Sequence, residues 1–214
     1  MSDMRWTIIP LEKRHLHSAV ELHLKAFPSF FLSFLGPSFL REFYSSFLND
    51  SVGVGLVAQE AVDGRVVGVV VGSSNSNGYF KRLLRRRWWA FCWASFSAIL
   101  RRPAILPRLF RALCYRGDTP CGPSRALLSS IAVDPIAQYS GVGKALVSTW
   151  VETMRSKKSV RGCYLTTDAD GNDAVNRFYG SCGWILESSF VTKDGRKMNR
   201  YTLDFGCQHV EKKF

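Results

Sequence analysis

One segment, residues 125–168, constrains the fold most, because a strand, a helix and a second strand follow one another within it. The run RALLSSIAVDP is apolar and ends at a proline, and GCYLTTD is the next run with strand character. Between them, GKALVSTWVETM repeats apolar residues at helical spacing, with Leu146, Val147, Trp150 and Met154 on one side. This alternation of strands and helices predicts an α/β fold.

The rest of the chain extends the alternation in both directions. Strands are predicted at 5–10, 125–135 and 162–168, helices at 11–27, 38–48, 143–158 and 173–183, and hairpins at 55–74 and 184–205. The hairpins turn at Asp63-Gly64 and Asp194-Gly195, dipeptides that are typical of tight β-turns. We therefore expect a mixed α/β sheet in a single domain, residues 1–214, with an insertion at 73–122 between the third and fourth strands.

The loop before the 143–158 helix contains Gly141 and Gly143. The first amides of a helix lack intrahelical partners and carry partial positive charge, so they attract anions. Glycine lets a phosphate approach the backbone closely, which predicts a diphosphate site. The loop fits neither a Walker A motif nor a dinucleotide fingerprint, because each motif requires a glycine that the loop lacks. In addition, Ala145 stands where the Walker A motif has serine or threonine. A turn that needs glycine for its geometry alone is the alternative.

Two motifs follow each other about forty residues apart in the last ninety residues. The first, V-x-P-x-x-Q-x-x-G-V-G, is matched by Val133, Pro135, Gln138, Gly141, Val142 and Gly143. The second is NDAVNRFYGSCGW at 172–184, which matches N-x-x-A-x-x-F-Y-x-x-x-G-F with the alanine displaced by one position. Together they resemble the GNAT superfamily of N-acetyltransferases. The resemblance implies a sheet of six to seven strands, acetyl-coenzyme A (acetyl-CoA) as cofactor and direct acetyl transfer to a primary amine in a ternary complex.

The resemblance also implies where the cofactor binds. The pyrophosphate is expected at Gln138, Tyr139, Ser140, Gly141, Val142, Gly143, Lys144 and Ala145. In the family the fourth and fifth strands splay apart, which places the pantetheine arm along Ile131, Ala132 and Val133 here. Asn172, Asn176 and Tyr179 are expected to contact the cofactor as well, although asparagine is also a common helix cap.

Tyr179 stands where many family members carry the acid that protonates the departing sulfur. A phenol with a pKa of ~10 is mildly mismatched to a thiol of ~8.5, a gap that proximity can cover. Packing, or a hydrogen bond to the cofactor, is the alternative role for Tyr179. The base is less defined. Asp168 is the preferred candidate for the general base. The other candidates are Ser129 and Ser130 on the fourth strand, Asp170, Glu60, His23 and a water chain.

Positive charge is concentrated in one region of the chain. Eleven basic residues and no acidic residue occur between Asp63 and Asp118, although the whole chain carries a net charge of +12. This region predicts two helices broken at Pro103, and the stretch from Trp88 to Leu100 is apolar on all sides. Three partners could contact this basic and apolar region: the protein itself or a dimer partner, an anionic membrane surface contacted through 79–116, or the phosphates of an acidic substrate. Nucleic acid is disfavoured as a partner.

The remaining composition points to an intracellular enzyme without a metal. The six cysteines form no C-x-x-C pair, so no zinc or redox site is predicted. The first residues show no signal pattern and no apolar run reaches ~18 residues, so we expect a cytoplasmic protein. The favoured acceptor is an amino sugar on a nucleotide or lipid diphosphate. A protein or peptide amine, and a non-catalytic acyl-CoA-binding module at the membrane surface, are the alternatives.

Overall fold

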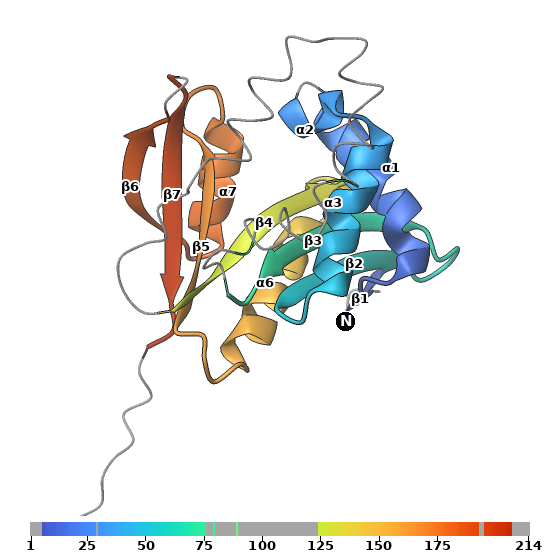
Figure 1. The fold of residues 1–214 in the computed structure, drawn as a ribbon, viewed down its shortest axis with the longest axis horizontal. Helices are drawn as coiled ribbons and strands as arrows, with labels where there is room; N and C mark the ends of the chain where they lie inside the picture. Colours follow the sequence, from blue (N-terminus) through green and yellow to red (C-terminus); the bar gives the residue numbers. More distant parts are fainter. Residues whose placement is uncertain are drawn as a thin grey trace, which may run out of the picture.

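A seven-stranded mixed sheet organises the protein in the computed structural model, which describes residues 6–28, 30–75, 79, 89, 124–192 and 195–206. The strand order is β1-β2-β3-β4-β5-β7-β6, and β4 and β5 form the parallel pair among otherwise antiparallel neighbours (Figure 1). The strands are β1 (Trp6–Pro10), β2 (Gly53–Glu60), β3 (Val66–Ser73), β4 (Arg125–Val133), β5 (Gly162–Asp168), β6 (Ile185–Val191) and β7 (Lys197–Asp204). The helices are η1 (Lys13–His15), α1 (Leu16–Ala26), α2 (Phe31–Phe34), α3 (Pro37–Asn49), η3 (Pro135–Ala137), α6 (Val142–Arg155) and α7 (Asp173–Ser181).

The predicted mixed sheet is confirmed, with seven strands in the predicted chain order. The short helix α2 was not predicted, because four residues between a helix end and a Gly-Pro break carry too little periodicity to detect. The helices predicted within 73–122 lie outside the described residues, apart from Tyr79 and Trp89. The assignment of the whole chain to one domain stays a prediction.

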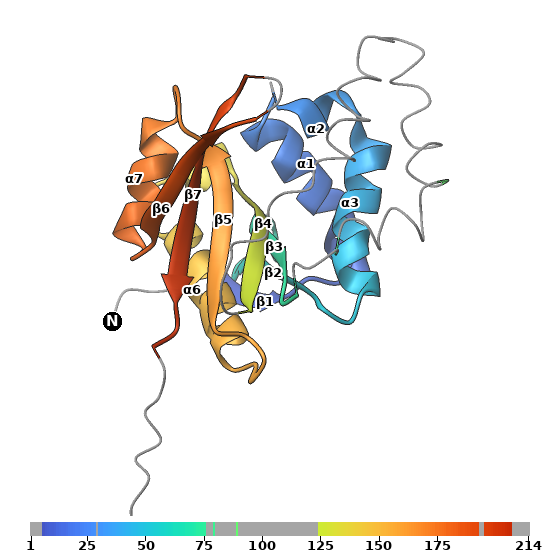
Figure 2. The same cartoon turned by 60° about the vertical axis from the view of Figure 1, so that its left-hand side comes forward.

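One face of the sheet is covered by α1 and α3, which pack on β2 and β3 (Figure 2). The apolar face expected for α3 is confirmed, since Phe39, Leu40, Phe43 and Phe47 are all buried there. Tyr79 belongs to the same cluster. Its ring stacks on Phe47 at 5.4 Å between centroids, and its hydroxyl lies 3.3 Å from the Ser46 Oγ. Tyr79 therefore anchors the beginning of the 73–122 segment to this face.

The opposite face is covered by α6, whose predicted apolar side is buried. Trp150 is fully buried and its indole N–H donates to the carbonyl of Val54 at 3.4 Å. Gly72 on β3 makes room for this ring, since a Cβ there would lie 2.4 Å from Trp150 Cζ2 and 2.3 Å from the Leu127 carbonyl oxygen. The close contact fixes the position of α6, and with it the glycine loop that precedes the helix.

Among the described helices, none combines the length and apolar character needed to cross a bilayer.

Candidate functional site

The strands β4 and β5 pair at one end and separate at the other. Pairing joins Arg125–Leu127 to Gly162–Tyr164, after which β5 continues along β7 and β4 continues along β3. Figure 1 shows β4 leaving β5 and running toward the α1–α3 side of the sheet. Ser129 falls at a register shift, because Val71 pairs with Ser130 and Gly72 with Leu128. A β-bulge therefore lies where the gap between the two strands begins.

The paired end of β4 and β5 is fixed by a network of ion pairs. The Arg125 guanidinium donates to both carboxylate oxygens of Asp204, at 2.8 and 2.9 Å, and also to Glu187. Its side chain is 10% exposed, and the hydrogen bond to Asp204 raises the pKa of Arg125 above its ordinary value. Gly162 lets β7 approach closely, because a Cβ would lie 2.7 Å from Asp204 Oδ1. The strands are thus closed at this end and open toward the glycine loop.

The open edge of β4 presents backbone groups that lack a strand partner. The N–H of Asp134 donates to Val67 O at 2.8 Å, so the backbone of Asp134 faces β3. Backbone groups alternate direction along a strand, so those of Ala132 face β3 and those of Val133 and Ile131 face the gap. No described strand pairs with β4 on that side beyond Leu127. Of the three residues expected along the pantetheine arm, two therefore have free backbone groups.

The start of α6 has the features of an anion site. Gly141 is the N-cap with φ +89°, and no side chain caps the helix. The first amide to bond within the helix is that of Ala145, which donates to Gly141 O. The amides of Val142, Gly143 and Lys144 are therefore left without helical partners. A pyrophosphate fits this arrangement of donors at the positive end of the helix dipole.

The loop residues before α6 are open to solvent. Gln138, Tyr139 and Ser140 are all exposed, and the Ser140 hydroxyl donates to Ala137 O at 2.6 Å. Tyr139 is fully exposed and has φ +66°, the left-handed region that favours glycine. Such a conformation costs roughly 1–3 kcal/mol and tends to persist at ligand-binding sites.

Gly143 connects the loop to α7 and to the end of β4. A Cβ on Gly143 would lie 3.5 Å from the Phe178 ring and 3.6 Å from a Val133 methyl group. The structure therefore brings together three sequence-distant parts of the expected cofactor site: the glycine loop, the open end of β4 and α7.

Tyr179 on α7 is buried in an aromatic cluster. Its ring lies 5.2 Å from that of Phe178, 6.1 Å from that of Trp184 and 6.0 Å from that of Tyr201. Burial raises the pKa of Tyr179 above its ordinary value, so the phenol stays protonated at neutral pH. The mismatch with a thiol is therefore larger than the sequence predicted. The position of Tyr179 is compatible with a packing role and with proton donation, so its role stays a prediction.

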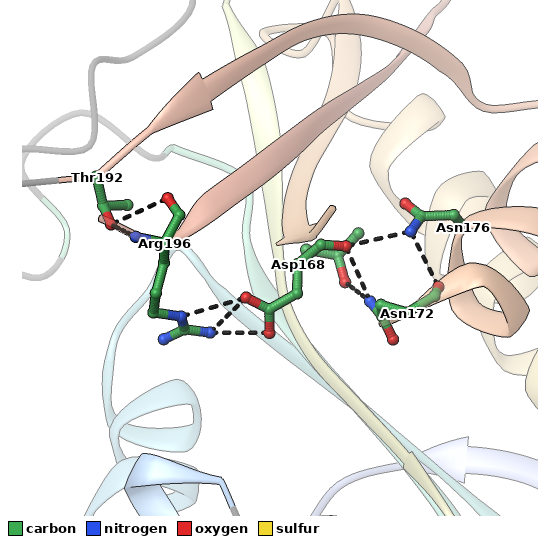
Figure 3. A network of polar contacts seen from close by, with 6 residues as sticks. Asp168, Asn172, Asn176, Thr192 and Arg196 are labelled. Atoms are coloured by element: carbon green, nitrogen blue, oxygen red, sulfur yellow. Dashed lines mark hydrogen bonds and ion pairs between the residues drawn. The ribbon is translucent and has the colours of Figure 1, made fainter. Parts of the chain in front are cut away.

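Asp168 and the two asparagines form one network at the end of β5 (Figure 3). The Asp168 carboxylate binds the Arg196 guanidinium at 2.7 and 2.8 Å. Its backbone oxygen accepts from the Asn172 and Asn176 amides at 3.2 and 3.1 Å. Arg196 contacts both carboxylate oxygens of Asp168, and Oδ2, which accepts a single hydrogen bond from it, keeps a further lone pair. The assignment of Asp168 as the base stays a prediction.

The asparagine side chains are mostly occupied within the protein. Asn176 donates to Asp168 O and Asn172 O, and its Oδ1 accepts from Asn199 and from the Tyr201 hydroxyl, both at 3.1 Å. The Asn172 amide donates to Thr167 Oγ1 at 2.7 Å. Asn176 therefore holds α7 to β5 and β7, and Asn172 is the better placed of the two to offer an oxygen to a ligand.

The other predicted base candidates lie in two different environments. Glu60 pairs with Arg65 at 3.1 Å and Asp170 lies 3.7 Å from Lys197, both near the surface. His23, in contrast, is buried, with its Nδ1 2.9 Å from the Tyr44 hydroxyl. Ser130 on β4 is half-buried, and the buried Ser129 Oγ has no hydrogen-bond partner in the part of the chain that the structure describes.

Sequence reasoning missed Tyr44 and Arg196. The signal for Tyr44 is a polar hydroxyl that directly follows Phe43 on the apolar face of α3. Arg196 gave no signal in the sequence, because both of its partners are distant from it along the chain. These partners are the Asp168 carboxylate and the ring of Phe30, whose centroid lies 6.0 Å from the guanidinium. In the part of the chain that the structure describes, no cluster of His, Cys, Asp and Glu could hold a metal ion.

Comparison with known proteins decides what this arrangement is. The model of the acetyltransferase (GNAT) family matches residues 16–184. The chain belongs to the GNAT acetyltransferase family. This GNAT protein is therefore an acetyl-CoA-dependent N-acetyltransferase, and acetyl-CoA supplies the acetyl group as a thioester. No curated protein matches the chain with significance.

Solved structures share the fold of this GNAT enzyme at low sequence identity. The ribosomal-protein-S18-alanine N-acetyltransferase from Escherichia coli is 17% identical over 98% of this chain and 99% of its own, with a TM-score of 0.59. A SpeG spermidine N-acetyltransferase mutant from Vibrio cholerae is 14% identical over 94% and 95%, with a TM-score of 0.58. Arabidopsis thaliana NAA60 in complex with acetyl-CoA is 15% identical over 94% and 98%, with a TM-score of 0.58.

Proposed function

We propose that this enzyme acetylates a primary amine carried by an anionic small molecule. An amino sugar on a nucleotide or lipid diphosphate is the favoured class. The observation that carries the proposal is the region between Asp63 and Asp118, with eleven basic residues and no acidic one. Tyr79, which precedes ten of these eleven basic residues, packs on the α1–α3 face, opposite the face covered by α6. The positive charge of the residues that follow Tyr79 would attract anionic acceptors.

The charge also disfavours the acceptors named for two proteins of the same fold. Spermidine is a polycation, and a concentrated positive region raises the energy of bringing a polycation to the enzyme. The alanine of ribosomal protein S18, which the name of the other enzyme gives as its acceptor, carries no phosphate for the arginines to bind. A lipid-linked acceptor would bring 79–116 to an anionic membrane surface, which is how the proposed membrane contact would arise.

For the donor substrate, we propose that the residues predicted from the family motifs bind acetyl-CoA. The amides of Val142, Gly143 and Lys144 would hold the pyrophosphate, with Gln138, Tyr139, Ser140 and Ala145 lining the same loop. The free backbone groups of Ile131 and Val133 would hold the pantetheine arm and orient the thioester for attack. These roles are supported by the uncapped helix start and by the gap beside β4.

The acceptor class is tested by measuring thiol release with four acceptors at equal concentration. These are a UDP-linked amino sugar, the same amino sugar without the diphosphate, spermidine, and a peptide with a free N-terminus. We expect kcat/KM for the UDP-linked sugar to exceed that for the free sugar at least tenfold, and to fall as salt rises because the attraction is screened. Highest kcat/KM with spermidine or the peptide would refute the proposed acceptor class.

A second prediction concerns Tyr179 as the proton donor to the departing thiolate. Tyr179→Phe keeps the ring and its packing against Trp184 and Tyr201, and removes the hydroxyl alone. Turnover should fall at least tenfold, the low end of what one acid–base group contributes. The affinity for acetyl-CoA, measured by calorimetry, should change less than threefold. Unchanged turnover would leave Tyr179 with a packing role only.

A further inference from the structure

The Arg196 guanidinium lies at the open end of the gap between β4 and β5 and contacts residues on both sides of it. Its Nε and Nη2 donate to the Asp168 carboxylate at the end of β5, at distances of 3.2, 2.7 and 2.8 Å. Its central carbon lies 6.0 Å from the centroid of the Phe30 ring. Phe30 packs against Phe27, which packs on the cluster between α1, α3 and the sheet. Arg196 therefore connects the β5–β7–β6 side of the gap to the side that carries α1 and α2.

The position of Asp168 places this ion pair level with the expected thioester. The last pair between β4 and β5 joins Leu127 to Tyr164. Ile131 and Asp168 stand the same number of residues beyond that pair, on the two strands that flank the gap, so they lie at about the same level along it. The backbone of Ile131 faces the gap and is proposed to hold the pantetheine arm. An acceptor that presents its amine in the gap can therefore place the rest of its structure beside Asp168 and Arg196.

The Arg196 guanidinium keeps hydrogen-bond donors that the ion pair does not use. Asp168 occupies the edge formed by Nε and Nη2, whereas Nη1 makes no hydrogen bond to any residue that the structure describes. Figure 3 shows this third nitrogen pointing away from Asp168. The Arg196 side chain is 45% exposed, so a ligand can reach it. The free end of the guanidinium can therefore donate to an anion.

We propose that Arg196 is a specificity-determining residue, which binds the diphosphate of the acceptor through Nη1. The inference rests on the proposed acceptor class and names a residue that recognises it. Arginine and phosphate oxygens form short, charge-assisted hydrogen bonds. Because the Asp168 carboxylate already orients the planar guanidinium, less side-chain freedom is lost when phosphate binds. The backbone of Arg196 is held as well, since its N–H donates to Thr192 Oγ1 at 3.1 Å and its carbonyl oxygen accepts from the Thr192 N–H at 2.8 Å.

A purely structural role for the ion pair would add little, because β5 and β7 are joined at this point without it. Asp168 pairs with Met198 across the two strands, and the Ala169 N–H donates to Lys197 O at 2.9 Å. Ion pairs exposed to solvent contribute little to stability. The neighbouring cation of Lys197 is itself engaged, since its Nζ lies 3.7 Å from Asp170 Oδ2. Recognition of a ligand therefore explains the oriented, half-exposed guanidinium better than the stability of the fold does.

Kinetic constants of Arg196→Gln with three acceptors test the inference: a UDP-linked amino sugar, the same sugar on a prenyl diphosphate, and the sugar without a diphosphate. We expect KM for both diphosphate acceptors to rise about tenfold, because each loses a charge-assisted hydrogen bond that is made equally before and during the reaction. The preference for them over the free sugar should fall at least fivefold. A structural role alone would lower kcat/KM for all three acceptors equally and leave the preference unchanged. In the native enzyme, the diphosphate acceptor with the higher kcat/KM identifies a nucleotide or a lipid as the carrier.

Arg155→Gln is the matched control, because Arg155 also combines an ion pair with a contact to an aromatic ring. Its Nη1 lies 2.9 Å from Glu152 Oε1 and its central carbon 5.0 Å from the centroid of the Phe205 ring, at the end of α6 remote from the glycine loop. Arg155→Gln should leave KM for every acceptor within twofold, and melting temperatures should show that both variants are folded.

Two outcomes would overturn the role of Arg196 and leave the acceptor class intact: native preference in Arg196→Gln, or an equal loss of preference in Arg155→Gln. A native enzyme that shows no preference for the diphosphate acceptors would instead refute the acceptor class, and with it the recognition of diphosphate by Arg196. The native enzyme and the variants therefore report on the two proposals separately.

Discussion

Replacing both Gly141 and Gly143 by alanine should weaken acetyl-CoA binding about 100-fold, a loss of about 2.7 kcal/mol. At Gly141, φ +89° is closed to alanine without strain, so the amides of Val142 and Gly143 would turn away from the pyrophosphate. At Gly143, the new methyl group would narrow the space between Phe178 and Val133. Calorimetric titration of the double variant with acetyl-CoA measures the loss.

Gly36→Ala separates the binding effect from backbone strain. Gly36 is the N-cap of α3, as Gly141 is of α6, and both have φ +89° with nothing within 4 Å of the position that a Cβ would take. Gly36 has ψ 173°, in a region essentially limited to glycine, and Gly141 has ψ −9°, in the left-handed region. Gly36→Ala should therefore strain the backbone at least as much as Gly141→Ala, while it leaves acetyl-CoA affinity within threefold of native. Equal affinities for the double variant and the native enzyme would show that the pyrophosphate binds elsewhere.

Trp150→Ala should lower the free energy of unfolding by about 3–5 kcal/mol, the range for deleting a large buried aromatic side chain. The indole fills the space above Gly72, so its loss leaves a cavity under α6 and removes the hydrogen bond to Val54 O. Urea unfolding followed by circular dichroism measures the change. Because α6 carries the loop that contacts the cofactor, saturating acetyl-CoA should recover part of the lost stability.

The neighbouring residue provides the control for this second prediction. Thr149 is exposed on the same helix, and Thr149→Ala should change the unfolding free energy by less than about 0.5 kcal/mol. A loss of less than about 1 kcal/mol in Trp150→Ala would contradict the view that α6 is held to the sheet mainly by this contact.

The fold was predictable because its signals are local. The periodicity of Leu146, Val147, Trp150 and Met154 defined the buried face of α6, and Asp63-Gly64 located the first hairpin turn. These features depend on residues a few positions apart, so the sequence displays them directly. The family motifs added the cofactor and the type of reaction, which periodicity alone could not supply.

The details of the candidate site were less accessible, because they depend on partners far apart in the chain. The sequence identified Asp168 and His23 as candidates, but it could not show that Arg196 binds the first or that the Tyr44 hydroxyl lies 2.9 Å from the second. The direction of each backbone group on β4 was hidden as well, because it depends on the register with β3 and on the bulge at Ser129. Long-range pairing, rather than residue type, decides these points.

Amide chemical shifts during titration with acetyl-CoA test directly whether the start of α6 binds the pyrophosphate. We expect the largest shifts at the amides of Val142, Gly143 and Lys144, together with Ile131 and Val133. Pantetheine, which lacks the pyrophosphate, should shift the two β4 amides and leave the three α6 amides in place. Unchanged shifts of the α6 amides at saturating acetyl-CoA would show that the pyrophosphate does not bind at the start of α6.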